Sequence, residues 1–341
     1  MNFRITIKDI TDEDTKLIWK NFENDSINYC FQNYYWLKHW YDINLKKNKI
    51  KSYIVFVYSG EEVIMILPLC VRTFFGVKIL SWLGGNQADY MCPLVVSGLK
   101  FEKNEFLALW RDILVSVKYF DFIFFNKQPS YIKDIENPFV HYLSSYKSSS
   151  AYSLILNNNF VHKKEKYSSS NNNINVQIIK DEKFRIKYIK KILEEKIIRL
   201  KEKKLRNTFD DNNIKFYLEF CEKDFSHGKE HISCLFIKNI EASGHWGVVY
   251  KNDFYYLLPV IFNTEFLKMS PGKILIKYLI NWAAINQIQV FDFSVGNEDY
   301  KKNYSNSTLL LYDYCYCENL KGLFHFVFYL IKKVIKSRRY A

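Results

Sequence analysis

The stretch SPGKILIKYLINWAAINQIQVFDFSVGNEDYKKNY, Ser270–Tyr304, decides the fold of the second half of this 341-residue chain. Its apolar residues recur at helical spacing, which predicts an amphipathic helix over Gly272–Ile285 followed by a strand over Val290–Val295. Serine is favoured just before a helix and proline at its first position, so the helix is expected to begin at Ser270-Pro271. The first turn of a helix presents unpaired N–H groups and the positive end of the helix dipole, which favour an anion.

The predicted anion site consists of Ser270, Pro271, Gly272 and Lys273. Lys273 adds a positive charge suited to a pyrophosphate or a 3′-phosphate. Many helices begin in this way without a ligand, so an ordinary helix start is the alternative interpretation.

A polar turn follows the predicted strand. Asp292 alternates with Phe291 and Phe293, so one face of the strand offers polar groups. Within a few residues the chain then supplies a candidate base, a candidate acid and a cation, which are Glu298, Tyr300 and Lys301. A turn followed by a charged helix start is the simpler alternative. His245 is also an acid or base candidate, but a single histidine on a strand is more often packed, so it is left out of the catalytic set.

Both halves of the chain show the same order of predicted elements. In the second half, three strands precede the helix at residues 231–238, 244–250 and 254–262. In the first half, strands predicted at 53–58, 63–71, 77–83 and 91–96 precede a helix at 106–117 and a strand at 120–125. The tripeptide Phe-Asp-Phe occurs near the strand after the helix in both halves, at Phe120–Phe122 and Phe291–Phe293. Two similar units in tandem are therefore expected.

The second half resembles the acetyltransferase domain of the CelD-like family of cellulose biosynthesis, part of the GNAT superfamily. The resemblance rests on the Ser-Pro-Gly helix start, the Trp-Ala helix end and the Asp-Phe-x-x-Gly-x-Glu-x-Tyr-Lys block within Ser270–Tyr304. The first half resembles the same family at Leu67-Pro68-Leu69 and over Trp82–Tyr90. The likeness spans about Phe31 to Tyr314.

The resemblance implies an α/β (α+β) fold of two tandem GNAT-like domains, each a mixed, mainly antiparallel sheet flanked by helices, related to Fem-type aminoacyltransferases. It implies acyl transfer to an amine or hydroxyl, with the coenzyme A pyrophosphate at Met269–Lys273. The chain departs there from the usual Gln/Arg-x-x-Gly-x-Gly/Ala loop, and Fem-type relatives use aminoacyl-tRNA, so both donors stay open. No metal is expected.

Direct attack of an amine on a thioester needs positioning and proton transfer but no covalent enzyme intermediate. In this scheme Glu298 or Asp292 accepts the proton of the amine, Tyr300 protonates the departing thiolate, and Lys301 holds a substrate phosphate. In the first half Trp82, Asp89 and Tyr90 are the expected acceptor-binding residues. A plain turn after Gly84-Gly85-Asn86 is the alternative there.

The expected organisation has four segments. They are an N-terminal GNAT-like half (1–165), a polar linker with a basic connecting helix (166–206), a C-terminal acyltransferase half (207–319) and a basic amphipathic C-terminal helix (320–341). The basic helix has two interpretations, a solvated face or a surface for tRNA or membrane.

Composition limits the partners. The net charge of +13 favours anionic ligands such as acyl-CoA, nucleotide-linked sugars, tRNA or acidic lipids. Seven cysteines without paired spacing and an N-terminus without an apolar core predict a cytoplasmic protein, with peripheral contact at the inner membrane face through the basic C-terminal tail. The expected activity is N-acylation, with acetyl-CoA as donor, of an amino sugar or similar small amine in surface polysaccharide synthesis. The alternatives are an aminoacyl-tRNA-dependent transferase and a non-catalytic accessory protein.

Overall fold

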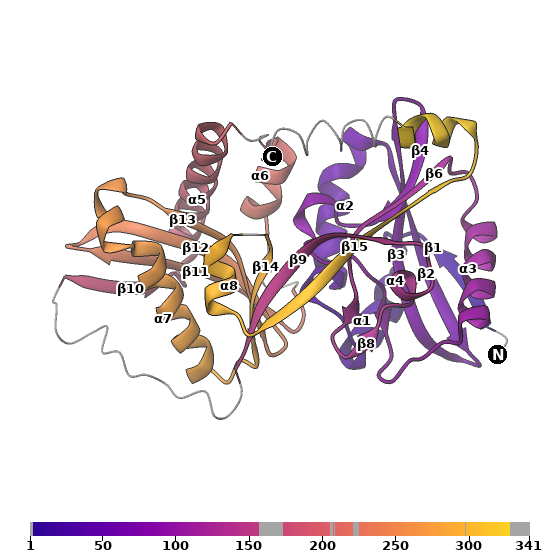
Figure 1. Ribbon diagram of the computed structural model, residues 1–341, viewed down its shortest axis with the longest axis horizontal. Coiled ribbons are helices and arrows are strands. Elements are labelled where there is room, and N and C mark those ends of the chain that lie inside the picture. The colour runs from indigo at the N-terminus through magenta and orange to yellow at the C-terminus, as the bar shows by residue number, and fades with distance from the viewer. Residues whose placement is uncertain are drawn as a thin grey trace. The chain divides into compact units, whose positions relative to one another are not determined.

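The computed structural model describes residues 3–156, 173–204, 207, 209–220, 225–296 and 298–327, apart from the side chains of 46–48. The chain forms two compact units, Met1–Ser150 with Leu309–Ala341, and Ala151–Thr308 (Figure 1). The serine- and asparagine-rich part of the predicted linker and the last residues of the predicted C-terminal helix lie outside the described residues.

The first unit has the sheet order β1-β2-β3-β4-β6-β15, with β5 beside β3. Its strands are β1 (Phe3–Lys8), β2 (Ile50–Ser59), β3 (Glu62–Phe74), β4 (Val77–Trp82), β5 (Leu94–Val95), β6 (Phe122–Pro129) and β15 (Ser307–Cys317), with a small hairpin β7 (Tyr131–Ile132) and β8 (Ile135–Glu136). Its helices are α1 (Glu13–Asp25), α2 (Tyr34–Asn48), α3 (Lys103–Val117) and α4 (Pro138–His141). Strands β2 and β3, which correspond to the predicted strands at 53–58 and 63–71, form an antiparallel hairpin that pairs up to Ser59 and Glu62.

The second unit repeats this plan as β9-β14-β13-β12-β11-β10. Its strands are β9 (Tyr146–Ile155), β10 (Ile174–Ile178), β11 (Gly228–Ile237), β12 (Ile240–Tyr250), β13 (Asp253–Ile261) and β14 (Val290–Val295), and its helices are α5 (Glu182–Glu202), α6 (Asp211–Leu218), α7 (Pro271–Ile285) and α8 (Asp299–Tyr304). The predicted helix and strand of the Ser270–Tyr304 stretch are α7 and β14, and the predicted basic helix is α5.

Each unit is completed by a strand from the other half of the sequence. Strand β9 lies at the end of the N-terminal half of the sequence but pairs with β14 of the second unit, through Val290↔Ile155 and its neighbours. Strand β15 follows the second half but pairs with β6, through Cys317↔Phe122 and its neighbours. The division of the chain therefore differs from the predicted boundaries at 165 and 319, because contacts group residues from Leu309 onward with the first unit.

The second unit buries both faces of its sheet. Helix α7 contributes Leu275, Leu279 and Ala283 to a core with Phe254 and Phe291. Helix α5 covers the opposite face of the sheet (Figure 1). Two adjacent residues of β12, whose side chains point to opposite faces, show this. Trp246 bonds Glu230, which pairs with Arg185 of α5, whereas the adjacent His245 stacks on Phe254 on the α7 side.

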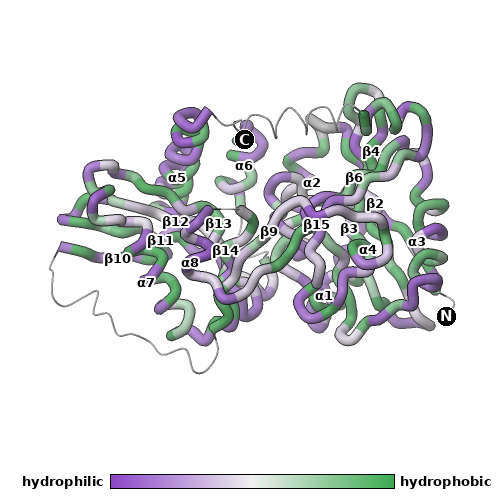
Figure 2. The backbone as a smooth tube through the Cα atoms, in the orientation of Figure 1, coloured by the Kyte–Doolittle hydropathy of each residue, from purple (hydrophilic) through white to green (hydrophobic). Residues whose placement is uncertain are grey.

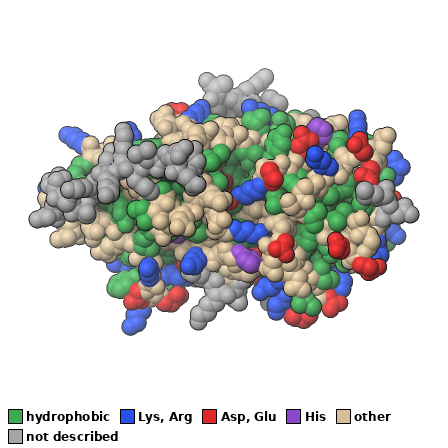
Figure 3. Space-filling view, turned by 90° about the horizontal axis from the view of Figure 1, so that it is seen from below, with side chains coloured by type: hydrophobic (Ala, Val, Ile, Leu, Met, Phe, Trp, Pro, Cys, Tyr) green, Lys and Arg blue, Asp and Glu red, His purple; other side chains and the backbone are tan. Residues whose placement is uncertain are grey.

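The first unit is built around aromatic residues. Trp19, Phe31 and Trp36 from the helical layer are completely buried, as are Phe56 of β2 and Phe125 of β6. No described helix is long and apolar enough to cross a bilayer. In Figure 3 basic and acidic side chains are interspersed on the face shown, without one continuous basic patch.

Candidate active site

The candidate site lies where two parallel strands of the second unit separate. Strands β13 and β14 pair only from Asp253↔Val290 to Tyr255↔Asp292, although β13 continues to Ile261 and β14 to Val295. Both strands are irregular at this level, since β13 shifts register against β12 between Trp246 and Gly247 and β14 shifts against β9 after Asp292. Bulges turn strands away from their partners. Backbone edges beyond the last pair can accept an extended ligand, as sheet edges do.

Helix α7 begins just past the end of β13. Pro271 is its first residue, and Lys273 and Ile274 donate their N–H groups to the carbonyl of Ser270. Proline has no N–H, so the N–H of Gly272 remains as the donor of the first turn that points out of the helix start. Ser270 and Lys273 are exposed, and Pro271 is buried. The four residues predicted as an anion site thus form one helix start.

Ser270 does not cap this helix as expected. It occupies the N-cap position, but its backbone is left-handed, with φ 54° and ψ 56°, and its side chain accepts no hydrogen bond from the helix. The chain reaches α7 from a 3₁₀ turn over Thr264–Met269 (η4), and the sharp change of direction at Ser270 explains the left-handed backbone. The first turn is held instead by Ser243 of β12, whose hydroxyl donates to the carbonyl of Pro271 at 3.2 Å.

The end of β14 is shaped by Asp292. Its carboxylate is buried and accepts a hydrogen bond from the N–H of Ser294 at 2.6 Å. Ser294 has a positive φ of 60°, which is uncommon for a residue other than glycine. The contact stabilises the bulge, so the carboxylate of Asp292 is occupied in shaping the strand.

Glu298 and Lys301 form an ion pair directly beyond the strand. Lys301 Nζ lies 3.1 Å from Glu298 Oε2 and donates to the carbonyl of Val295 at 2.6 Å. The side chain of Lys301 is 7% exposed and that of Glu298 57% exposed. The pair lies against Gly296, whose φ is 144° and where any side chain would collide with both charged groups. Glycine at this position lets the ion pair close over the strand end.

The electrostatics keep Glu298 ionised and Tyr300 protonated. Burial raises the pKa of Glu298, but the positive charges of Lys301 and Lys196 outweigh it and hold that pKa below its ordinary value. Burial, and then the negative charge of Glu298, raise the pKa of Tyr300. The two groups therefore rest in the protonation states of a base and an acid, while both pKa shifts weaken their proton transfer in those roles.

Lys196 of α5 is a site residue that the sequence analysis missed. Burial lowers its pKa to about 8, opposed by Glu298 and reinforced by the cations Lys301, Arg199 and Lys203. The sequence does carry a signal for it. Ile189, Ile192 and Leu193 form the buried stripe of α5, and Lys196 continues that stripe at helical spacing. A lysine in a buried stripe needs an anionic neighbour or a ligand.

The cationic end of α5, the end of β13 and the start of α7 meet at Ile261. Arg199 Nη2 donates to the carbonyl of Ile261 at 3.2 Å. The side chain of Ile261 is also the nearest neighbour of Gly272, at 3.7 Å from where a Cβ would lie. Positive charge from α5 and the positive end of α7 therefore gather at the same strand end.

The predicted acceptor-binding residues belong to the first unit. Trp82 is 2% exposed, donates to Gln128 Oε1 at 3.2 Å and packs on Phe125. Tyr90 is 1% exposed and packs against Phe31. Both side chains lie in the core of that unit, where they are not accessible to an acceptor.

Asp89 is the partly exposed member of this set. Its carboxylate lies 3.4 Å from Lys127 Nζ, which also donates to the carbonyl of Ala88. Lys127 in turn has a positive φ of 54°, and its N–H is held by Asp313 of β15. Of the three predicted residues, Asp89 has the most exposed side chain, at 28%.

The described residues contain no group of three or more His, Cys, Asp or Glu side chains arranged to hold a metal. His245 and its neighbour His231 are buried in the α7 side of the sheet, with no hydrogen-bond partner for any of their ring nitrogens. Burial lowers the pKa of both, to about 4 for His231. His245 therefore packs as a neutral, buried ring.

Residues 166–302 match the family model of the acetyltransferase (GNAT) domain. No matching protein was found among the curated proteins. Three similar solved structures are a tandem GNAT protein from the clavulanic acid biosynthesis pathway, solved without acetyl-CoA (TM-score 0.51, 8% identity, 93% of this chain and 99% of that one), FemX (0.57, 10%, 92% and 97%) and L-PGS from Bacillus licheniformis (0.54, 10%, 97% and 99%).

The fold expected from the sequence is thereby confirmed. The chain has a mixed α/β fold of two GNAT-like units in tandem, each with a mainly antiparallel sheet flanked by helices. Within this class, the candidate site lies in the part of the chain that is similar to GNAT acetyltransferase domains.

Proposed function

We propose that this protein is a GNAT-type N-acyltransferase that transfers an acyl group, acetyl from acetyl-CoA, to the amine of a small acceptor. The acceptor class we propose is an amino sugar, free or nucleotide-linked, used in surface polysaccharide synthesis at the cytoplasmic side of the inner membrane. The match of residues 166–302 to the acetyltransferase (GNAT) domain supports the choice of acetyl-CoA as donor. The proposed polysaccharide context rests on the resemblance of Ser270–Tyr304 to the CelD-like family.

One observation carries the proposal. Glu298 and Tyr300 lie just beyond the end of β14, and the charge of Lys196 acts on Glu298. One turn further along α5, Arg199 bonds the carbonyl of Ile261, the residue that borders the start of α7. The helix start suits the phosphates of a donor, and the separated strand edges suit its extended chain. The charged cluster then lies where the reactive end of such a donor would emerge.

The chemistry assigned to these residues balances in protons. As the acceptor nitrogen forms a bond to the thioester carbonyl carbon, Glu298 accepts the proton that the nitrogen loses. As the carbon–sulfur bond breaks, Tyr300 donates its proton to the leaving thiolate. Lys301 is a positioning residue, because its buried ammonium holds Glu298 against the strand end. This replaces the phosphate-holding role first expected for Lys301, whose side chain is almost fully buried.

Calorimetric titration with acetyl-CoA and with free CoA tests the donor. Gly272→Trp and Lys273→Ala are expected to weaken binding of both ligands, Gly272→Trp by about tenfold or more because it covers the helix start. A Cβ atom fits at Gly272, since its nearest neighbour would be Ile261 at 3.7 Å, and the melting temperature of Gly272→Trp checks that the larger side chain leaves the fold intact. Ile285→Trp, at the opposite and exposed end of α7, is the matched control for Gly272→Trp. Lys277→Ala, at an exposed lysine one turn after Lys273, is the matched control for Lys273→Ala.

Wild-type protein that binds neither ligand would overturn the acyl-CoA assignment. Equal losses in the control variants would move the site away from the start of α7.

An aminoacyl-tRNA-dependent transfer is the second candidate. Lys196, Arg199 and Lys203 form a cationic stripe at the end of α5, and FemX and L-PGS share the fold. A phosphate backbone would be drawn to such a stripe. In this case transfer depends on charged tRNA and is abolished by ribonuclease, and acetyl-CoA binds no better than an unrelated nucleotide.

A further inference from the structure

The described part of the C-terminal helix exposes the side that a surface helix normally buries. Residues 320–327 are helical, and Leu320, Leu323, Phe324 and Val327 follow the i, i+3, i+4, i+7 spacing of an apolar stripe. In a surface helix that stripe usually faces the core. Here Leu320 is 74% exposed and Phe324 77% exposed, with Leu323 and Val327 about half exposed.

The helix cannot bury the stripe by turning, because its opposite side is fixed to the first unit. Gly322 lies directly against the carbonyl of Asp121, where any side chain would collide. Asn319 donates to the Asp121 carboxylate at 2.8 Å, and the same carboxylate accepts the N–H of Lys78 at 2.8 Å. Phe122 contacts the rings of His325 and Phe326 on this inner side.

The tip of the β3–β4 hairpin extends the exposed surface. Phe74 lies 5.9 Å from His325 between ring centroids, and Phe75 packs edge-on against Phe74 at 4.5 Å. Phe75 is 88% exposed. Figure 2 shows hydrophobic residues gathered where the hairpin and the helix lie together. We call this surface the C-terminal apolar patch, formed by Phe74, Phe75, Leu320, Leu323, Phe324 and Val327.

Phe75 occupies a turn position at the hairpin tip that normally favours asparagine or glycine. Phe75 and Gly76 are the two central residues of the turn, and both have positive φ, 47° and 78°. Two-residue turns of this kind prefer Asn-Gly, and a bulky residue at positive φ is strained. An exposed phenylalanine at this position contributes nothing to burial and costs backbone strain, which indicates a role outside the fold.

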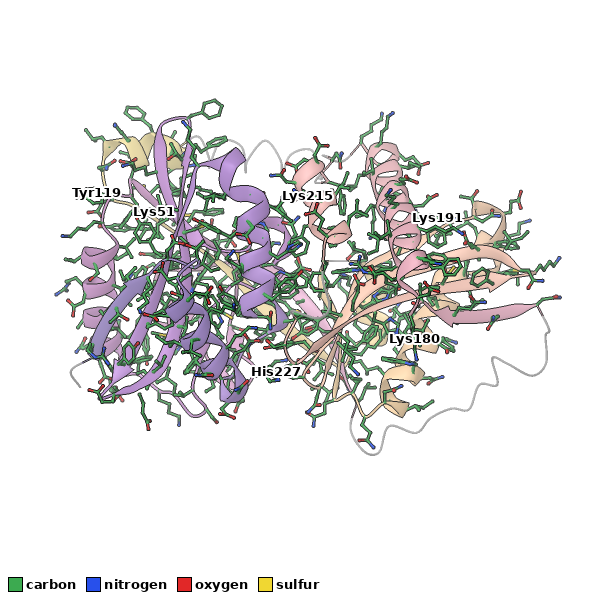
Figure 4. All side chains as sticks on the ribbon, turned by 180° about the vertical axis from the view of Figure 1, so that it is seen from behind. Lys51, Tyr119, Lys180, Lys191, Lys215 and His227 are labelled. Atoms are coloured by element: carbon green, nitrogen blue, oxygen red, sulfur yellow. The ribbon has the colours of Figure 1, made fainter. Side chains whose placement is uncertain are left out.

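Exposed lysines adjoin the patch, together with one exposed acidic residue, Glu318, just before the helix. Lys78, Lys118 and Lys321 are exposed beside it, and Lys78 lies over the ring of Tyr119, itself 76% exposed and labelled in Figure 4. From Asn319 to the C-terminus the sequence has six Lys and Arg residues and no Asp or Glu. A second copy of the chain placed on this patch would bring like charges together, so self-association is disfavoured.

We propose that the C-terminal apolar patch docks the protein on an anionic membrane surface. Apolar side chains enter the headgroup boundary, while Lys78, Lys118 and Lys321 pair with acidic lipid headgroups. Tyr119 suits that boundary because its ring is apolar and its hydroxyl is polar, and the wholly apolar ring of Phe75 suits the acyl side of it. This inference is independent of which donor the second unit binds.

Co-sedimentation of the full chain with vesicles tests the proposal. Wild-type protein is expected to bind phosphatidylcholine vesicles that contain phosphatidylglycerol, to bind phosphatidylcholine alone weakly, and to be released by salt. Phe75→Asn combined with Phe324→Gln should lower binding by about tenfold or more. Asn suits the turn, so Phe75→Asn alone is expected to keep or raise the melting temperature. Leu17→Gln, which removes a 63% exposed leucine from α1, is the matched control.

The proposal is overturned if wild-type protein does not bind the anionic vesicles, or if the double variant binds them as well as wild type. Concentration-dependent self-association that the double variant abolishes, without vesicle binding, would assign the patch to a second copy and also overturn it.

Discussion

The two units share one plan but fill the equivalent position differently. In each sheet the described strands form one parallel pair, β4 with β6 and β13 with β14, which separates after a few residues. In the first unit, Trp82 follows the last pair and packs on Phe125 and Phe139 at 4.8 and 5.2 Å between ring centroids. In the second unit, charged groups around Glu298 gather beyond the last pair.

The difference shows that two copies of one fold can differ in role: the same position serves packing in the first unit and holds a charged cluster in the second. Aromatic residues beyond the parallel pair close the first sheet with apolar contacts. Charged residues in the second unit are retained at an energetic cost, because partly buried charges lose hydration. Such a cost is typical of functional positions.

The largest expected effect is on transfer by the second unit. Glu298→Gln keeps the size of the side chain but removes the proton acceptor, so the rate should fall by about 10²–10⁴-fold. The buried ammonium of Lys301 also loses its counter-charge, so the free energy of unfolding is measured beside the rate. The measurement is acetyl transfer to a panel of amino sugars and their nucleotide-linked forms. Asp89→Asn in the first unit is expected to change the Michaelis constant for acceptor rather than the turnover rate. Full activity of Glu298→Gln would remove this residue from the mechanism.

The next largest effect is expected on the stability of the first unit. Trp82→Ala should lower the free energy of unfolding by about 3–5 kcal/mol, because it empties a buried aromatic site. Urea unfolding followed by circular dichroism measures it, and Trp82→Phe should cost less. A loss below about 1 kcal/mol would show that this position is not the packing centre of the first unit.

Acid should destabilise the second unit through its buried histidines. Burial lowers the pKa of His231 from 6.5 to about 4 in the folded protein and also lowers that of His245. The unfolded chain therefore binds more protons below pH about 6.5, and stability falls from there toward pH about 4, by about 3 kcal/mol for His231. Replacing both histidines with leucine should flatten the pH dependence over this window. An unchanged slope would contradict the assignment.

The smallest expected effect concerns Lys196. Its ammonium is expected to help hold an anionic donor, so CoA affinity should fall a few-fold as pH rises through about 8, where this lysine loses its proton. Lys196→Met should bind more weakly at neutral pH and lose this pH dependence. Lys190→Met, on the exposed face of the same helix, serves as the control. A pH dependence retained in Lys196→Met would assign it to another group.

Local sequence patterns predicted most of the elements. The helix over Gly272–Ile285 and the strand over Val290–Val295 are confirmed within a residue, because periodicity and turn residues act locally. The exchange of β9 and β15 was not predicted, since strand pairing between distant segments leaves no local pattern. Strand β9, YKSSSAYSLI, also lacks a clear apolar alternation.

The site was predicted only in part, because sequence patterns are local and the packing of helices is not. Glu298, Tyr300 and Lys301 follow one another in sequence, so their proximity could be foreseen. The burial of Lys301 and the approach of Lys196 depend on how α8 and α5 pack, which sequence spacing does not reveal. Lys191 on the same helix, labelled in Figure 4, pairs instead with Glu241 of β12. A basic helix therefore supplies both structural pairs and a candidate site residue.

The exchanged strands also constrain how the chain can fold during synthesis. Strand β6 ends at Pro129, but its neighbour β15 begins at Ser307, so the edge of β6 must wait until nearly the whole polypeptide has left the ribosome. Domains usually fold in the order of their synthesis, and an unpaired edge strand invites aggregation. The first half made alone is consequently expected to be poorly soluble. A shortened gene ending before Ser307 would leave the sheet of the first unit without β15, although all six strands of the second unit would be present.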